Sequence, residues 1–269
     1  MSSPLARGLF HKAIMQSPYI PVATKLKKEK FGRASAEQAG LNLSHALGAE
    51  SLIQLRDLPA ISFLNLLDRK RGYGAFLPEV TVDGWSLKSQ VYEIFEGNNH
   101  INVPVMVGFN SGEAYHLGAY DGWTAKIPED QYTYRVSVRQ RYGILSNEYL
   151  NLYPADNLKE AIFAPVRDGF YGWAAQKIAT TASAINDNIY LYYFDHPPAW
   201  AEESGFGAFH GSEIVYSFNN VKHGYKYSPS WPDYVASKKD LEMAEIISDY
   251  WVAFAKTGNP NTQGRQPWN

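Results

Sequence analysis

The sequence contains no cysteine among its 269 residues. Disulfide bridges and thiolate metal sites are therefore excluded for these residues, and redox chemistry gives no indication of the compartment. Positive charge is not in excess either, because 25 lysines and arginines stand against 27 aspartates and glutamates. We therefore do not expect nucleic acid to be a partner.

Long apolar runs are also missing. No stretch approaches the roughly 18 to 20 apolar residues that span a bilayer, and the first twenty residues lack the apolar core of a signal peptide. The sequence thus predicts no membrane span and leaves localisation open, since any signal peptide would precede Met1. What is present is the composition of a globular chain, with 45% hydrophobic and 19% charged residues, long enough for one large core.

Three apolar segments indicate strands. Residues 103–109 form a continuous apolar run interrupted only by Pro104 near its start, as expected of a strand buried on both faces. Residues 189–194 form a second run, and residues 11–16 form a shorter strand that ends at Ser17-Pro18. Helical patterns are predicted at residues 25–47, 50–56, 61–71, 86–96, 130–142, 146–153, 171–185 and 238–256. Strands that alternate with helices indicate an α/β sheet.

An acid and a base stand out at places where strands end. His210 lies between two glycines in the sequence GAFHGSEI, residues 207–214, and Glu113 lies in the polar turn that follows the strand predicted at 103–109. Ligands of α/β sheets bind at the carboxyl ends of strands. A histidine that is held by a carboxylate keeps one tautomer, and its other ring nitrogen can accept a proton from a hydroxyl nucleophile. From spacing alone, a structural role for either residue remains the alternative.

Other candidates are weaker. Five histidines show no metal-ligand spacing and are expected to be packed or solvated: His11, His100, His116, His196 and His223. Asp168 either supports the acid and base from behind, without contacting the substrate, or is an acid at a helix N-terminus. The aromatic residues after it are read as core in preference to a substrate pocket wall: Phe170, Tyr171 and Trp173.

Four segments, taken together, resemble a known family. They are SPLARGLFHKAIMQS at 3–17, VGFNSGE at 107–113, AFHGSEI at 208–214 and WVAFAKTGNPN at 251–261. In this order they resemble consecutive landmarks of the type B carboxylesterases, the cholinesterase-like branch of the α/β-hydrolases. The resemblance implies a partial α/β-hydrolase fold that lacks the N-terminal half, with residues 1–269 as the C-terminal part of one carboxylesterase domain.

The same resemblance implies the chemistry. It assigns Glu113 as the acid that orients His210, although the turn reads Gly-Glu-Ala where the family commonly has Asp-Glu-Gly. The implied activity is hydrolysis of a small-molecule carboxylic ester through a serine nucleophile and a covalent acyl-enzyme, with no cofactor and no metal.

The family's serine is not found in this sequence. There is no Gly-x-Ser-x-Gly elbow and no Gly-Gly pair for an oxyanion loop, so the chain is expected to begin just after the nucleophile and to lack triad-dependent activity by itself. Ser111 and Ser212 are better explained as a turn former and a helix cap than as substitutes. The strand near Ala13 is then expected to have an open edge that can pair with another chain. The alternatives are a non-catalytic cholinesterase-like binding module and a truncated pseudoenzyme.

Overall fold

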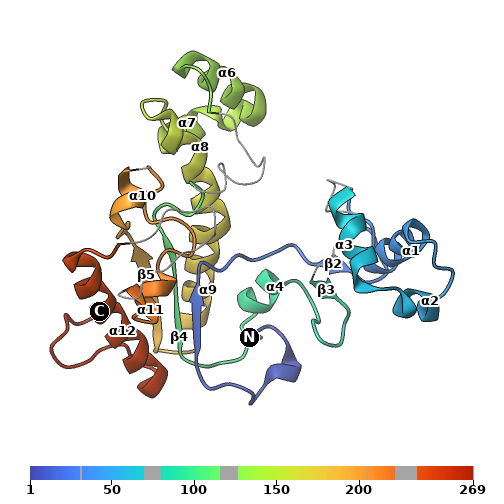
Figure 1. The fold of residues 1–269 in the computed structure, drawn as a ribbon, viewed down its shortest axis with the longest axis horizontal. Coiled ribbons are helices and arrows are strands. Elements are labelled where there is room, and N and C mark those ends of the chain that lie inside the picture. Colours follow the sequence, from blue (N-terminus) through green and yellow to red (C-terminus); the bar gives the residue numbers. More distant parts are fainter. Residues whose placement is uncertain (31, 70–79, 116–126, 204, 222–234, 269) are drawn as a thin grey trace. The chain divides into compact units, whose positions relative to one another are not determined.

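The computed structural model describes residues 1–30, 32–69, 80–115, 127–203, 205–221 and 235–268. The chain forms two compact units. Unit 1 consists of Met1–Leu9 and Ile20–Ile101, and unit 2 consists of Phe10–Tyr19 and Asn102–Asn269. Figure 1 shows the helices and strands of both units, coloured along the chain, and labels most of them.

Unit 1 is built from short elements around a small core. Its elements are a 3₁₀ turn η1 (Pro4–Ala6), β2 (Thr24–Lys25), α1 (Ala36–Ala46), α2 (Leu52–Asp57), α3 (Ala60–Arg69), β3 (Thr81–Val82) and α4 (Val91–Glu96). β2 and β3 pair in parallel. Ala23, Leu87 and Ile94 form a buried cluster. The buried Gln90 side chain donates to the Ala23 carbonyl and accepts from the Ala23 main-chain amide, both at 2.8 Å, and so binds the residue before β2.

Two helices of unit 1 are shorter than predicted. The helix expected at 25–47 begins only at Ala36, because the Ser35 side chain caps it by accepting from the Gln38 amide; the lysine-rich start instead contributes Lys25 to β2. The helix expected at 86–96 begins only at Val91. Before it, the Asp83 carboxylate binds the amides of residues 85 and 87 and so holds a turn. The last two residues of the helix predicted at 61–71 lie outside the described residues.

Unit 2 contains the predicted α/β sheet. β1 (Ala13–Gln16), β4 (Val105–Asn110) and β5 (Ile189–Phe194) are parallel in the order β1-β4-β5. All six residues of β4 are buried, in agreement with the continuous apolar run from which this strand was predicted. A side chain at Gly108 would collide with Tyr192, whose ring lies 2.3 Å from an ideal Cβ at that position. Glycine therefore allows the centre of β4 to approach β5 closely.

Helices cover both faces of this sheet (Figure 1). On one face, Met106 packs with Tyr192 and Phe194 against α11 (Ile214–Ser217) and α12 (Lys238–Thr257). On the other face, α9 (Trp173–Ser183) packs on β4 and β5. α12 matches its predicted range within one residue because a Ser237–Asp240 capping box starts it and Gly258, at φ 82°, ends it.

The remaining helices of unit 2 are α6 (Gln131–Tyr142), a 3₁₀ turn η3 (Gly143–Leu145), α7 (Ser146–Leu152), α8 (Leu158–Val166), a π-helical turn η4 (Arg167–Gly172) and α10 (Ala199–Glu203). Buried side chains of α6 and α8 form a second cluster that includes Tyr134 and Ala161. α8, η4 and α9 follow one another without a break, whereas the sequence predicted a helix only from residue 171. Pro165 within α8 obscured this helix, since proline normally interrupts helical patterns. Within the described ranges, no helix has the length and apolarity needed to cross a membrane.

Candidate active site

Glu113 lies in the turn that directly follows β4 and is completely buried. Its Oε1 accepts a hydrogen bond from the Ser17 hydroxyl at 2.5 Å and another from the main-chain amide of Asn110 at 2.8 Å. Its Oε2 faces His210 Nδ1 at 2.5 Å. The structure thus brings together the two residues that the sequence singled out, although they are 97 positions apart.

Backbone hydrogen bonds join the turn of Glu113 to the loop of His210. The Gly112 amide donates to the Ala208 carbonyl at 2.9 Å, and Gly112 forms a parallel bridge with Phe209. The Asn110 side chain donates to the Phe209 carbonyl at 2.9 Å. Gly112 leaves no room for a side chain, because an ideal Cβ would lie 2.5 Å from the Phe206 carbonyl oxygen. The carboxylate and the imidazole are therefore positioned by main-chain contacts as well as by their own hydrogen bond.

The loop that presents His210 depends on glycine at two positions. Gly207 and Gly211 have φ angles of 59° and 82°, in the region that side chains rarely adopt. These are the two glycines between which His210 lies in the segment GAFHGSEI. They allow the chain to reverse on either side of the histidine, whose side chain remains 39% exposed.

The surroundings of His210 favour its protonated form. The hydrogen bond to Glu113 raises the pKa of His210, burial opposes this effect, and the negative charges of Glu113 and Glu213 add to the rise. Nδ1 is the nitrogen that faces the carboxylate, so a neutral ring that donates from Nδ1 has Nε2 as its basic atom. The ring of Tyr171 lies against the imidazole with centroids 5.0 Å apart, and burial followed by the charge of Glu113 raises the pKa of Tyr171 to about 12.

A second buried carboxylate lies beside the first. Glu213 accepts from the Asn110 side chain at 2.5 Å and from the Gln16 side chain at 3.0 Å. Burial raises the pKa of Glu213, and the Asn110 hydrogen bond acts in the opposite direction. Sequence reasoning missed the roles of Ser17, Asn110 and Glu213. One signal was available for Asn110, a polar residue at the last position of an otherwise apolar strand; Ser17 was noted only as the end of a strand.

The other candidates from the sequence have different roles. Ser212 is completely buried, and it does not cap a helix as predicted, because α11 has Glu213 at its N-cap position. Ser111 lies in the turn, as predicted, and its carbonyl accepts from Arg167. Asp168 binds Arg167 and Tyr153. Neither serine stands on a strand-to-helix elbow.

The predicted histidines and aromatic residues also fall at separate places. His100 stacks on Phe95 in unit 1, and His196 pairs with Asp240 at 2.7 Å in unit 2. Phe170 and Trp173 are about half exposed, so they do not form core as predicted. His116 and His223 lie outside the described residues, and the described residues contain no group of three or more acidic or histidine side chains that could hold a metal ion.

Comparison with known proteins decides the family. The profile of the carboxylesterase family matches residues 1–269. The chain belongs to this family. It is 24% identical over 286 residues to carboxylesterase 5A of Canis lupus familiaris, covering 99% of the chain and 47% of that protein. It is 24% identical over 275 residues to fumonisin B1 esterase of Sphingopyxis macrogoltabida, covering 100% and 48%.

A liver carboxylesterase of Sus scrofa is similar to the same degree, with 26% identity over 298 residues that cover 99% of the chain and 50% of that protein. Among solved structures, a PNB esterase matches with a TM-score of 0.66 and 21% identity, covering 100% of the chain and 53% of the esterase. The predicted α/β-hydrolase fold class is confirmed. The chain spans about half the length of the curated carboxylesterases that it matches.

Proposed function

We propose that this chain supplies the base and the orienting acid of a Ser-His-Glu triad in a carboxylic ester hydrolase. The observation that carries the proposal is the 2.5 Å contact between His210 Nδ1 and the fully buried Oε2 of Glu113, in a chain that belongs to the carboxylesterase family. The third member is a serine outside the 269 residues, since no Gly-x-Ser-x-Gly elbow occurs in them. The substrate class is a small-molecule carboxylic ester.

In this mechanism, His210 moves one proton in each half-reaction. Nε2 accepts the proton of the serine hydroxyl while the serine oxygen attacks the ester carbonyl carbon, and the same proton passes to the alcohol oxygen as the ester bond breaks. In the second half, Nε2 accepts a proton from water, the water oxygen attacks the acyl carbon, and the proton returns to the serine oxygen as the carboxylic acid leaves. Glu113 keeps Nδ1 protonated and stabilises the imidazolium in both halves.

The test compares two forms of the protein. The purified chain alone should hydrolyse an activated ester no faster than its His210→Ala variant, since loss of a triad nucleophile costs on the order of 10⁶ in turnover. If a Gly-x-Ser-x-Gly elbow is encoded in frame upstream of Met1, joining that segment to residues 1–269 should give an esterase that His210→Ala inactivates and Glu113→Gln weakens by about 10⁴. His210-dependent turnover by the chain alone would contradict the outside serine. Turnover of the joined protein that survives His210→Ala would contradict the triad, and an inert joined protein would favour the non-catalytic binding module.

We also propose that β1 pairs with a strand of the segment that carries the serine. β1 is an edge strand of the described sheet. Ala13 and Ser17 donate their amides toward β4, so Ile14 and Gln16 direct theirs to the opposite side. Ile14→Pro should therefore reduce association with a separately expressed elbow-bearing segment, while Ile14→Val should not, as measured by sedimentation velocity. Equal association of both variants would contradict pairing through this edge.

Residues 1–269 are proposed to form part of one carboxylesterase domain, as the family match over the whole chain supports. One domain should unfold in a single cooperative transition. Hydrogen exchange that reports the same opening free energy for protected amides of units 1 and 2 would agree with this proposal. Two well-separated values would contradict it.

A further inference from the structure

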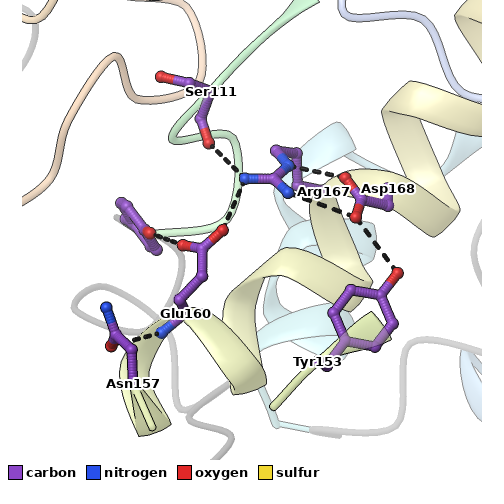
Figure 2. A network of polar contacts seen from close by, with 7 residues as sticks. Ser111, Tyr153, Asn157, Glu160, Arg167 and Asp168 are labelled. Carbon is purple, nitrogen blue, oxygen red and sulfur yellow. Dashed lines mark hydrogen bonds and ion pairs between the residues drawn. The ribbon is translucent and has the colours of Figure 1, made fainter. Parts of the chain in front are cut away.

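The residues around the turn of Glu113 form a second polar network, centred on Arg167 (Figure 2). The Arg167 guanidinium donates to the Ser111 carbonyl at 3.2 Å and to Glu160 at 2.9 Å. On its other side, it binds Asp168 through Nε at 2.7 Å and through a second nitrogen at 3.3 Å. Asp168 also accepts from the Tyr153 hydroxyl at 3.2 Å. A single side chain thus reaches one main-chain carbonyl and two carboxylates.

This network holds the acid turn on both flanks. Ser111, two residues before Glu113, is bound by Arg167. Tyr115, two residues after Glu113, donates its hydroxyl to the second carboxylate oxygen of Glu160. Because Glu160 is also the ion-pair partner of Arg167, the two flanks are joined through one ion pair. The turn between these residues has little freedom to rotate without breaking one of these contacts.

Helix α8, which contains Glu160, also contacts the loop that leads to His210. Lys159 of α8 donates to the Gly205 carbonyl, and its ammonium lies 4.7 Å from the centroid of the Tyr115 ring. Lys159, Glu160 and Arg167 therefore connect α8 and the start of η4 to both loops that carry the proposed acid and base. None of the three contacts Glu113 or His210 directly in the hydrogen bonds that the structure describes.

The π-helical turn η4 places residues of this helical segment beside both the turn of Glu113 and the loop of His210. In η4 the Trp173 amide donates to the Asp168 carbonyl, five residues earlier, and Arg167 is the first residue of this wider turn. Gly172 lets it approach β4, since an ideal Cβ there would lie 3.3 Å from the Phe109 ring. Tyr171, from the same turn, lies against the His210 ring. Such π turns are often found at functional sites.

The charges of the network support a fixed geometry. Burial opposes the charge of Arg167, but Asp168 and Glu160 outweigh this effect and raise the pKa of Arg167, so it remains a cation. An arginine has a planar fork of donors that can hold two carboxylates and a carbonyl at fixed angles, whereas a lysine has one compact ammonium. The contacts of Arg167 use this fork.

We propose that Arg167 is a positioning residue that acts, with Glu160 and Tyr115, by fixing the turn of Glu113 relative to His210. The inference rests on the proposed function for its catalytic meaning. Its structural content is testable in the chain alone, because the quality of the Glu113–His210 hydrogen bond is read from the titration of His210, which needs neither an ester nor a serine. A failed titration test and a failed esterase test are therefore distinguishable.

The decisive measurement is an NMR titration of the His210 imidazole in the full chain and in Arg167→Met, with the resonance assigned by His210→Gln. If the turn loosens, the hydrogen bond that raises the pKa weakens and the His210 pKa should fall by about 0.5 to 1 unit. If Arg167 acted only through its charge, its removal would raise the His210 pKa instead. The two roles thus predict opposite signs.

Two further variants complete the test. Tyr115→Phe removes one hydroxyl without changing any charge and should lower the His210 pKa by roughly 0.2 to 0.5 unit, so it decides the question if Arg167→Met does not fold. Arg265→Met breaks a comparable ion pair with Asp249 in the C-terminal region of unit 2 and should leave the His210 titration unchanged. An unchanged or raised His210 pKa in both network variants, or an equal fall in Arg265→Met, would overturn the proposal.

Discussion

Asn110 connects three parts of the site, and its removal gives a quantitative prediction. Its side chain is fully buried and donates two hydrogen bonds, to Glu213 at 2.5 Å and to the Phe209 carbonyl at 2.9 Å. Asn110→Ala leaves both acceptors without this donor in a buried region. A hydrogen bond to a charged group contributes about 1.5–3 kcal/mol and one to a neutral group about 0.5–1.5 kcal/mol, so the free energy of unfolding should fall by roughly 3 kcal/mol.

The loss should also depend on pH. The Asn110 hydrogen bond lowers the pKa of Glu213 and burial raises it, so Asn110→Ala should raise this pKa further. An acid with a raised folded-state pKa contributes stability that is present below its unfolded pKa and is lost as the pH rises through the folded pKa. The destabilisation should therefore be larger at pH 8 than at pH 5.

Hydrogen exchange measured by mass spectrometry on peptides from β4 and β5 reports the stability of unit 2. The matched control is Asn186→Ala, which also removes two hydrogen bonds, with Asn102 at 2.7 Å and the Asn188 amide at 2.9 Å, but at an exposed site. The control should cost less than about 1 kcal/mol because water replaces the lost partners. A cost for Asn110→Ala that does not exceed the control, or that does not grow from pH 5 to pH 8, would refute the reasoning.

Three other changes test individual features. Gly112→Ala would place a Cβ 2.5 Å from the Phe206 carbonyl oxygen. Urea unfolding should therefore show that the free energy of unfolding falls by about 1–3 kcal/mol, and NMR should show a lower His210 pKa. An unchanged His210 titration would contradict the close approach. Asp240→Asn should destabilise by at least about 1 kcal/mol at pH 7. Burial raises the pKa of Asp240, but hydrogen bonds led by those from Ser237 outweigh it and lower the pKa overall. The stability that Asp240 contributes is thus lost as the pH falls below the ordinary pKa of an aspartate. An equal cost of Asp240→Asn at pH 7 and at pH 3 would argue against this contribution. Gly258→Ala, at φ 82° and with Pro104 at 3.1 Å, should lower the melting temperature more than Gly264→Ala, at φ 80° with open space around it; equal shifts would show that only the backbone angle matters.

Strong local patterns predicted the sheet of unit 2. The apolar runs at 103–109 and 189–194 correspond to β4 and β5, since a strand buried on both faces needs continuous apolar residues. The π-helical turn could not be predicted in this way. Its main-chain hydrogen bonds join residues five positions apart, and no side-chain period within Arg167–Gly172 indicates that change.

The acid was found because it lies in the turn after a strand, and the base because glycines lie on both sides of it, although α10 separates His210 from β5. Their helpers have no such signature, because their positions depend on contacts between distant segments. Ser17 reaches Glu113 across 96 positions, and Gln16 reaches Glu213 across 197. Arg167 lies outside the helices predicted from the sequence, and its role follows only from the fold, which brings the Ser111 carbonyl to it.

The chain order of unit 2 has a consequence for how it folds. β1 is separated from β4 by the whole of Ile20–Ile101, which belongs to unit 1. β5 is about as far from β4 along the chain as β1 is. Closing such long loops costs entropy before the pairing of the strands compensates for it, so we expect the sheet to form in a late kinetic step. Ser17 and Gln16 arrive with β1. Until that step, Glu113 lacks the Ser17 donor and Glu213 lacks the Gln16 donor. These two side chains should therefore be held less rigidly in the folding intermediate than in the native protein.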